Sequence, residues 1–428
     1  MQIYVVQSGD SLVEIARRFN VSPAKIVTDN GLENQNVLVV GQALIIQFPE
    51  TVHTVKPGET LTSIAAQYST TVLTLLQNNP HLMTAPVLFE GEQLTISYRG
   101  EKRGQTSVNG YAYTNIEQNV LLRAIPFLTK LTIFGYGFTE TGELIGVDDQ
   151  AMINLAYEYK VAPIMLLSAI TEDGTFDIMR AGRMFHDVAL QNVVIDNIIA
   201  TMKEKGYLGL DIDFEYVVAT DADAFVSFIE NATKRLNAEG FTVNVDLAPK
   251  LSAGHPGLLY EAHNYERIGQ IADTVLLMTY EWGYSHGPPM AVAPIDQVKR
   301  VVTYAVTVIP VEKIYMGIPN YGYVWRLPFE QGITAGTSIG NQFAVELAAI
   351  HNAEIKYDET AQSPFFFYTA LDGSRNEVWF EDVRSIKEKW DVITQNNLLG
   401  GGYWNIMRPF AQNWALVNSL YDILKIVT

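Results

Sequence analysis

Residues 207–217 read YLGLDIDFEYV, and this stretch decides the fold that we expect for the chain. Side chains of a β-strand alternate between two faces, so the acids Asp211, Asp213 and Glu215 share one face and apolar residues occupy the other. Burying ions without partners costs on the order of several kcal/mol each, which makes three acids a poor filling for a core. We therefore expect this strand to line the inside of a barrel and to direct its acids toward a site.

The sequence around this strand predicts the rest of the barrel. Short apolar runs alternate with amphipathic segments over residues 107–428, which is typical of repeated βα units around a parallel sheet. The pattern predicts an α/β protein with a (β/α)8 TIM barrel. The eight predicted strands are residues 110–115, 131–136, 162–168, 207–215, 242–248, 274–280, 314–321 and 399–404.

The gap between the seventh and eighth strands is too long for one crossover helix. It holds the aromatic run FFFY at 365–368 and a turn at Asp372 and Gly373. We predict a small α+β insertion at about 325–381, followed by a helix over 382–394 that resumes the barrel. The insertion would form one wall of a substrate cleft.

The N-terminal part of the chain contains a repeat. Residues 6–12 read VQSGDSL and residues 55–61 read VKPGETL, and the offset continues through Asn30 and Asn79. Each copy is predicted to run strand, helix, helix, strand, with Ser11 and Thr60 as helix N-caps. We therefore expect two small α+β domains at 1–48 and 50–97, and a polar linker at 98–106 that leads to the barrel domain at 107–428.

Each copy resembles a LysM domain, a module that binds glycans containing N-acetylglucosamine, such as peptidoglycan and chitin. The resemblance rests on the G-D/E-x-L motif, the central Asn and the closing motifs GQAL at 41–44 and GEQL at 91–94. Two linked weak sites bind a polymer through effective concentration. The resemblance therefore implies anchoring to a wall glycan, and the alternative is a pair of spacers or protein-interaction modules.

Composition excludes some classes of partner. The 428 residues carry 47 acids and 29 bases, a net charge of -18, which disfavours a nucleic-acid partner because phosphates are bound by Lys and Arg. No apolar stretch reaches the roughly 18 to 20 residues of a membrane span, and we expect neither a signal peptide nor a membrane partner. The absence of cysteine excludes disulfides and thiolate metal sites. We expect a monomer without cofactor or metal.

The acids of residues 211–215 favour acid catalysis. Neighbouring carboxylates and a low-dielectric interior both raise carboxyl pKa values, and active sites of such barrels lie at the C-terminal ends of the strands. Glu215 is nearest that end, so we expect it to stay protonated near neutral pH and to act as a general acid. The alternatives are a calcium or magnesium site and a buried ion network.

This strand resembles the DxxDxDxE signature of glycoside hydrolase family 18, which includes many chitinases and N-acetylglucosaminidases. Three of the four acids are present, and Leu208 stands where the first acid is expected. The resemblance implies that Glu215 is the catalytic acid/base, that Asp213 holds the substrate acetamide, and that Asp211 shares protons with Asp213.

Further motifs follow in the order that the family requires. Residues 278–281 read MTYE and resemble Met-x-Tyr-Asp, which implies that Tyr280 contacts the acetamide oxygen. Residues 317–322 (GIPNYG) and 401–404 (GGYW) resemble the seventh and eighth strands of the family. One motif is missing, because Ser168 is followed by AIT where Ser-x-Gly-Gly is expected. The predicted substrate-binding residues are Tyr321, Trp404, Glu281, Tyr136 and Asn320.

The resemblance implies a retaining mechanism in which the acetamide of the substrate replaces a protein nucleophile. LysM copies joined to such a barrel resemble the cortex-lytic N-acetylglucosaminidases of Bacillus spores. We therefore expect a peptidoglycan hydrolase that cleaves spore cortex after N-acetylglucosamine during germination. The expected location is the boundary of spore coat and cortex, after synthesis in the mother cell without a signal peptide, or alternatively the cell wall. The competing functions are a chitinase and a non-catalytic glycan-binding coat protein.

Overall fold

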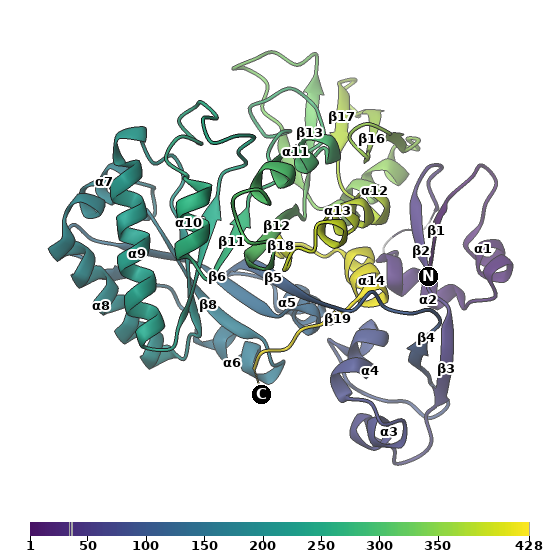
Figure 1. Ribbon diagram of the computed structural model, residues 1–428. Helices are drawn as coiled ribbons and strands as arrows, with labels where there is room; N and C mark the ends of the chain where they lie inside the picture. Colours follow the sequence, from purple (N-terminus) through teal and green to yellow (C-terminus); the bar gives the residue numbers. More distant parts are fainter. Residues whose placement is uncertain (34, 36, 428) are drawn as a thin grey trace.

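The largest part of the molecule is a closed barrel of eight parallel strands, shown in the computed structural model of Figure 1. The structure describes residues 1–33, 35 and 37–427, so the last residue of the predicted barrel domain lies outside it. Strand β5 pairs with both β6 and β18, which closes the ring and confirms the predicted fold class. The barrel strands are β5 (Gln105–Tyr113), β6 (Lys130–Phe138), β8 (Ala162–Ser168), β9 (Gly209–Asp213), β10 (Thr242–Leu247), β11 (Thr274–Leu277), β12 (Ile314–Pro319) and β18 (Gly400–Trp404).

Helices cover the outside of the ring (Figure 1). The predicted helix at 382–394 is α13, where Asp382 caps the N-terminus by accepting from the backbone N–H of Ser385. Val383, Ile386 and Trp390 recur at helical spacing and are buried, which explains why this segment packs as a helix. The barrel helices are α5 (Gln118–Ala124), α6 (Gln150–Glu158), α7 (Ile178–His186), α8 (Val188–Lys205), α9 (Ala222–Ala238), α10 (Tyr265–Ile271), α11 (Ile295–Ala305), α13 (Val383–Gln395) and α14 (Ala411–Leu420).

Short elements complete the barrel. Strand β7 (Leu144–Ile145) pairs with β6, and β19 (Asp422–Ile423) pairs with β5. The short 3-10 helices are η2 (Ile125–Phe127), η3 (Ala219–Asp221) and η4 (Val311–Lys313). Within the part of the chain that the structure describes, no helix combines the length and the apolar character that a bilayer span requires.

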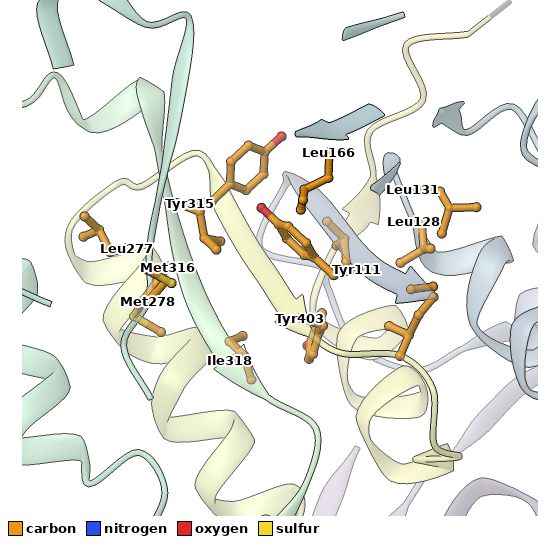
Figure 2. Packing of buried hydrophobic residues seen from close by; sticks show 14 of the residues in the cluster. Tyr111, Leu128, Leu131, Leu166, Leu277, Met278, Tyr315, Met316, Ile318 and Tyr403 are labelled. Carbon is orange, nitrogen blue, oxygen red and sulfur yellow. The ribbon is translucent and has the colours of Figure 1, made fainter. Parts of the chain in front are cut away.

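The interior of the barrel is packed with side chains from every second strand position. Figure 2 shows the rings of Tyr111 and Tyr315 extending from β5 and β12 into the region that the strands enclose. The Tyr315 hydroxyl lies 2.6 Å from the Ser107 hydroxyl near the beginning of the strands. These two buried hydroxyls therefore satisfy each other inside the barrel.

Each N-terminal repeat folds as a pair of helices against a two-stranded antiparallel sheet. Ser11 and Thr60 cap the first helix of each repeat, as predicted. Asn30 and Asn79 tie the second helix to the closing strand, because each exchanges hydrogen bonds with the backbone of one closing-strand residue. The elements are β1 (Gln2–Val5), α1 (Leu12–Phe19), α2 (Pro23–Asn30), β2 (Ala43–Ile46), and β3 (Pro49–Thr54), α3 (Leu61–Gln67), α4 (Val72–Asn78), η1 (Pro80–Leu82), β4 (Gln93–Tyr98).

Helix α14 attaches both repeats to the barrel. In Figure 1 it lies between the barrel and the repeats. Its Gln412 donates to Asn30 Oδ1 (2.9 Å) and to the Ala43 carbonyl (2.7 Å) of the first repeat. Its Asn418 donates to Asn78 Oδ1 (2.9 Å) of the second repeat. Strand β4 runs through Tyr98 and β5 begins at Gln105, so the linking segment is shorter than the predicted linker at both ends.

The insertion is a five-stranded antiparallel sheet with one helix. It begins at Gly322, before the predicted residue 325, because the aromatic strand after β12 already pairs with its neighbours there. Val39 of the first repeat packs into the insertion's core with Phe366 and Val378. The elements are β13 (Gly322–Leu327), β14 (Thr337–Ile339), α12 (Asn341–Ile350), β15 (Lys356–Asp358), β16 (Ser363–Thr369) and β17 (Arg375–Trp379).

Candidate active site

A cleft of about 610 Å³ opens at the carboxyl ends of β9, β10, β11 and β18. This is the end at which barrel enzymes carry their active sites. Five of the residues singled out from the sequence line it: Asp213, Glu215, Tyr280, Glu281 and Trp404. The structure therefore brings together acids and aromatic residues from strands that are far apart in the chain.

Glu215 lies beyond the end of its strand. We expected the strand to extend through it, but β9 ends at Asp213, and Tyr216 has a left-handed backbone with φ of 58°. This turn projects the Glu215 side chain into the cleft, where it is exposed. Burial of the surrounding site, and then the negative charge of Glu281, raise the pKa of Glu215. The group is suited to donate a proton.

His263 fixes the segment that carries Glu215. Its Nδ1 accepts the backbone N–H of Ala248 (2.9 Å), and its Nε2 lies 3.3 Å from the carbonyl of Phe214. Burial lowers the pKa of His263 to about 4, so the ring is neutral near pH 7 and its Nε2–H is available to Phe214. The ring thus connects the ends of β9 and β10 next to Glu215.

Asp213 is a buried carboxyl that forms no ion pair with any described residue. Its side chain is 8% exposed, and Oδ1 has no hydrogen-bond donor among the described residues. Burial, followed by the charges of Glu215 and Asp211, raises its pKa well above the usual value. Asp213 is therefore ready to hold a proton or to accept a donor from a bound substrate.

Asp211 lies deeper in the barrel than Asp213, and its carboxylate has hydrogen-bond partners. Tyr111 Oη donates to its Oδ2 (2.7 Å), and Asn244 Nδ2 donates to its Oδ1 (2.8 Å). Burial raises the pKa of Asp211, and hydrogen bonding with Asn244, Tyr111 and the neighbouring acid Asp246, together with the Lys130 charge, opposes that rise. The two acids of β9 thus differ in their environment although both point inward.

Asp246 is a further acid of the site, and we did not predict it. It lines the cleft from β10, is 4% exposed, and shares the partners Tyr111 (2.9 Å) and Asn244 (3.0 Å) with Asp211. The signal was present in the sequence, because the strand TVNVDL alternates Asn244 and Asp246 with apolar residues as β9 alternates its acids. Polar residues alternating on two neighbouring strands would have identified it.

A second group, of tyrosine hydroxyls, surrounds the acid Glu281 at the cleft. Tyr321 Oη donates to Glu281 Oε1, and Tyr323 Oη lies 3.2 Å from the same oxygen. Burial raises the pKa of Glu281, and these two hydrogen bonds oppose the rise. Burial also raises the pKa of Tyr280 well above its usual value, so its hydroxyl stays protonated. Tyr323 belongs to the insertion, so this unit contributes one side chain to the cleft lining.

Trp404 ends β18 among other aromatic rings. Its ring centroid lies 5.9 Å from that of Tyr111, 6.0 Å from Tyr113 and 5.5 Å from Phe134, all edge to face. These contacts fix the indole at the base of the cleft, where a flat apolar surface suits the face of a sugar ring.

Three of the five predicted substrate-binding residues, Tyr136, Asn320 and Tyr321, do not line the cleft. Tyr136 is 1% exposed, and its hydroxyl donates to Asp149 (2.5 Å) and accepts from Lys205 (2.8 Å). The cause is a register shift in β6 between Ile133 and Tyr136, after which simple alternation no longer predicts the direction of the side chain.

Asn320 is the second residue outside the cleft. Its side-chain amide donates to the backbone carbonyls of Asn405 (3.0 Å) and Arg408 (2.9 Å), so it joins the end of β12 to the segment after β18. Tyr321 itself contacts the site through Glu281. As for metal ions, the described residues contain no group of three or more His, Asp or Glu side chains arranged to hold one.

Comparisons with known proteins agree with this architecture. Residues 172–408 match the description of glycosyl hydrolases family 18, and residues 4–47 and 53–97 each match the LysM domain. The chain is 38% identical over 431 residues to the cortical fragment-lytic enzyme of Bacillus cereus, covering 99% of each chain.

Solved structures extend the comparison. The spore cortex-lytic enzyme SleL of Bacillus megaterium superposes with a TM-score of 0.84 at 36% identity, covering 100% of this chain and 99% of that one. A chitinase of Chromobacterium violaceum superposes with a TM-score of 0.68 at 25% identity, covering 73% of this chain and 98% of that one. The first likeness includes the LysM repeats and the barrel together.

Proposed function

The chain belongs to glycosyl hydrolases family 18, and from this premise we propose that it hydrolyses the glycan strands of spore-cortex peptidoglycan after N-acetylglucosamine. The observation that carries the proposal is the cleft in which the protonatable Glu215 stands beside the buried, unpaired Asp213 and the hydroxyl of Tyr280. The similarity to a cortical fragment-lytic enzyme over nearly the whole chain supports the choice of substrate.

The first step of the proposed mechanism is cleavage. Glu215 protonates the oxygen that bridges two sugars, while the acetamide carbonyl of the sugar on the non-reducing side attacks its own anomeric carbon. Asp213 receives the acetamide N–H at its unpaired oxygen, and Tyr280 donates its hydroxyl to the acetamide oxygen. The product of this step is a cyclic oxazolinium ion, so no protein nucleophile is required.

The second step is hydrolysis of that ion. Glu215, now ionised, takes a proton from water, which attacks the anomeric carbon from the face that the leaving sugar vacated. Two inversions at the same carbon retain its configuration. The raised pKa of Glu215 suits both steps, because one group must donate and then accept a proton at the same pH.

The mechanism restricts the substrate. The sugar at the cleavage site must carry a free 2-acetamido group, which N-acetylglucosamine and N-acetylmuramic acid both have. Muramic lactam, which is common in cortex, has its nitrogen in a ring and offers no acetamide. Cleavage after N-acetylglucosamine therefore fits a cortex substrate best.

The LysM repeats are proposed to hold the enzyme on the same polymer during germination. Because α14 attaches both repeats to the barrel through buried hydrogen bonds, a glycan bound to a repeat is held at a defined distance from the cleft. This arrangement suits an enzyme at the boundary of spore coat and cortex that acts as a monomer on an insoluble strand.

Parallel digestion tests the substrate. Purified spore cortex, vegetative cell wall and chitin are incubated with the enzyme, and the new reducing ends are identified by mass spectrometry. We expect N-acetylglucosamine at the reducing ends of cortex products. Products that end in N-acetylmuramic acid would contradict the proposed specificity, and no product from any polymer would support a non-catalytic role.

Hydrolysis of chitin is the second candidate activity. It is favoured by the similarity of the barrel to the chitinase of Chromobacterium violaceum, which covers 73% of this chain. In the same experiment, release of chitobiose from chitin at a rate above that of cortex cleavage would replace the cortex proposal.

A further inference from the structure

The deep end of the cleft contains more carboxyl groups than the proposed mechanism uses. Asp211 and Asp246 project inward from neighbouring strands, and both are buried. Together with Asp213 they place three carboxyl groups in the barrel interior, against the single ammonium group of Lys130 that acts on Asp211. The way in which they share protons is therefore part of how the site works.

The number of hydrogens between Asp211 and Asp246 is fixed by their partners. Asn244 Nδ2 has two hydrogens and supplies one to each carboxyl, at 2.8 and 3.0 Å. The Tyr111 hydroxyl has one hydrogen, yet its oxygen lies 2.7 Å from Asp211 and 2.9 Å from Asp246. One hydrogen cannot point at both oxygens at full strength, so both contacts are strong hydrogen bonds when one of the two carboxyls is protonated and donates to Tyr111.

The surroundings decide which carboxyl holds that proton. Lys130 is buried inside the barrel, with its Nζ 5.2 Å from the ring centroid of Tyr315, and its positive charge favours ionised Asp211. Burial, and then the charges of Asp211 and Asp213, disfavour the ionised form of Asp246, and no cation is among the described groups that act on it. The proton therefore belongs to Asp246.

We propose that Asp246 is a positioning residue that stays a neutral carboxylic acid and donates to Tyr111, which in turn donates to ionised Asp211. This arrangement rests on the proposed hydrolytic function. It keeps a second negative charge away from Asp213, so that Asp213 is able to ionise when the positively charged oxazolinium ion forms next to it. An ionised Asp246 would instead hold Asp213 in its protonated form.

Two substitutions of similar volume test the proposal. Asp246→Asn keeps a neutral polar group, whereas Asp246→Leu removes all hydrogen bonding. We expect D246N to keep kcat within about fivefold and to keep the pH profile of the parent, since a neutral Asn replaces a neutral acid. We expect D246L to lower kcat at least tenfold with KM within about twofold. The assay is hydrolysis of a soluble N-acetylglucosamine oligosaccharide from pH 4 to 9.

Controls separate this proposal from the function on which it rests. Asp223→Asn, at a side chain 93% exposed on α9, should match the parent enzyme, and thermal unfolding midpoints should show that all variants fold. Infrared spectra provide a readout independent of activity, because D246N should lack one protonated-carboxyl C=O band of the parent. The proposal would be overturned by an equal loss of kcat in D246N and D246L, or by a parental kcat in D246L. It would also be overturned if D246N kept the protonated-carboxyl band of the parent. Full activity in Glu215→Gln would overturn the proposed function instead.

Discussion

Asp213 and Glu381 are both carboxyl groups buried in the same chain, but they differ in what stands beside them. Glu381 is 1% exposed, and Lys389 Nζ lies 2.8 Å from its Oε2. Burial raises the pKa of Glu381, and the charge of Lys389 opposes that rise. Around Asp213 the charges that act are those of two further acids, which raise its pKa in the same direction as burial does.

This difference distinguishes buried acids that stabilise the fold from buried acids that are suited to catalysis. Glu381 joins the insertion to α13, and Asp149, which precedes α6, is similarly paired with Lys205 of α8 at 2.7 Å. Each of these has a cation that compensates its burial. Asp213 lies at the base of a cleft without such compensation, which is a cost to folding that a site tolerates for its function.

The largest expected effect is on the functional side of the comparison. Glu215→Gln preserves size but removes the transferable proton, so we expect kcat to fall by about 10²- to 10⁴-fold with the unfolding midpoint unchanged. The rate is measured on cortex fragments. Glu204→Gln, at an exposed acid on α8, is the matched control. Near-parental rates in E215Q would show that another group donates the proton.

The next effect is on the structural side. Lys389→Met leaves the Glu381 carboxyl buried without its cation, and we expect a loss of about 3–5 kcal/mol in the free energy of unfolding. Lys387→Met, two residues away on α13 in a partly exposed pair with Asp391, should cost at most about 1 kcal/mol. Denaturant titration measures both. Equal losses in the two variants would remove the distinction that we draw.

Asp213→Asn tests whether Asp213 belongs with the catalytic acids or with the acids that stabilise the fold. We expect kcat to fall on the order of 10²-fold through misplacement of the acetamide. The raised pKa means that the folded protein retains a proton that the unfolded chain releases above about pH 4, so parental stability falls as pH rises through the folded-state value.

The same variant should therefore show a shallower decline of unfolding free energy with pH than the parent, because Asn does not titrate. Denaturant titrations at several pH values measure this slope. An unchanged slope in D213N would mean that Asp213 is ionised in the folded protein, and that it belongs with Glu381 rather than with the catalytic acids.

The smallest expected effect concerns how the cleft tunes its acid. Glu281 raises the pKa of Glu215 by its negative charge, so Glu281→Gln should lower that pKa. The protonated acid would then be lost at lower pH, and the alkaline limb of the kcat/KM profile should move toward acid. Tyr323→Phe, which removes one hydroxyl from the same carboxylate, serves as the comparison. A shift of the limb toward alkali in E281Q would contradict this assignment.

Local sequence patterns alone were sufficient to predict much of this structure. Alternation along residues 207–217 identified the acids of β9, and apolar runs located the barrel strands, because period-two burial is a property of the strand itself. The sequence likewise indicated the N-caps Ser11 and Thr60 and the repeated Asn30 and Asn79. Each cap acts on backbone a few residues away, and each Asn stands at the same place in its repeat.

What the sequence by itself determined, then, is the family of folds, the LysM repeats and the identity of the acid strand, because these depend on neighbours along the chain. The tertiary structure alone decided which residues meet. A register shift turned Tyr136 away from the cleft, a left-handed turn carried Glu215 into it, and pairing of β9 with β10 brought Asp246 beside Asp211. The physical reason is that protonation depends on which charges lie close in space, and closing the barrel sets those distances.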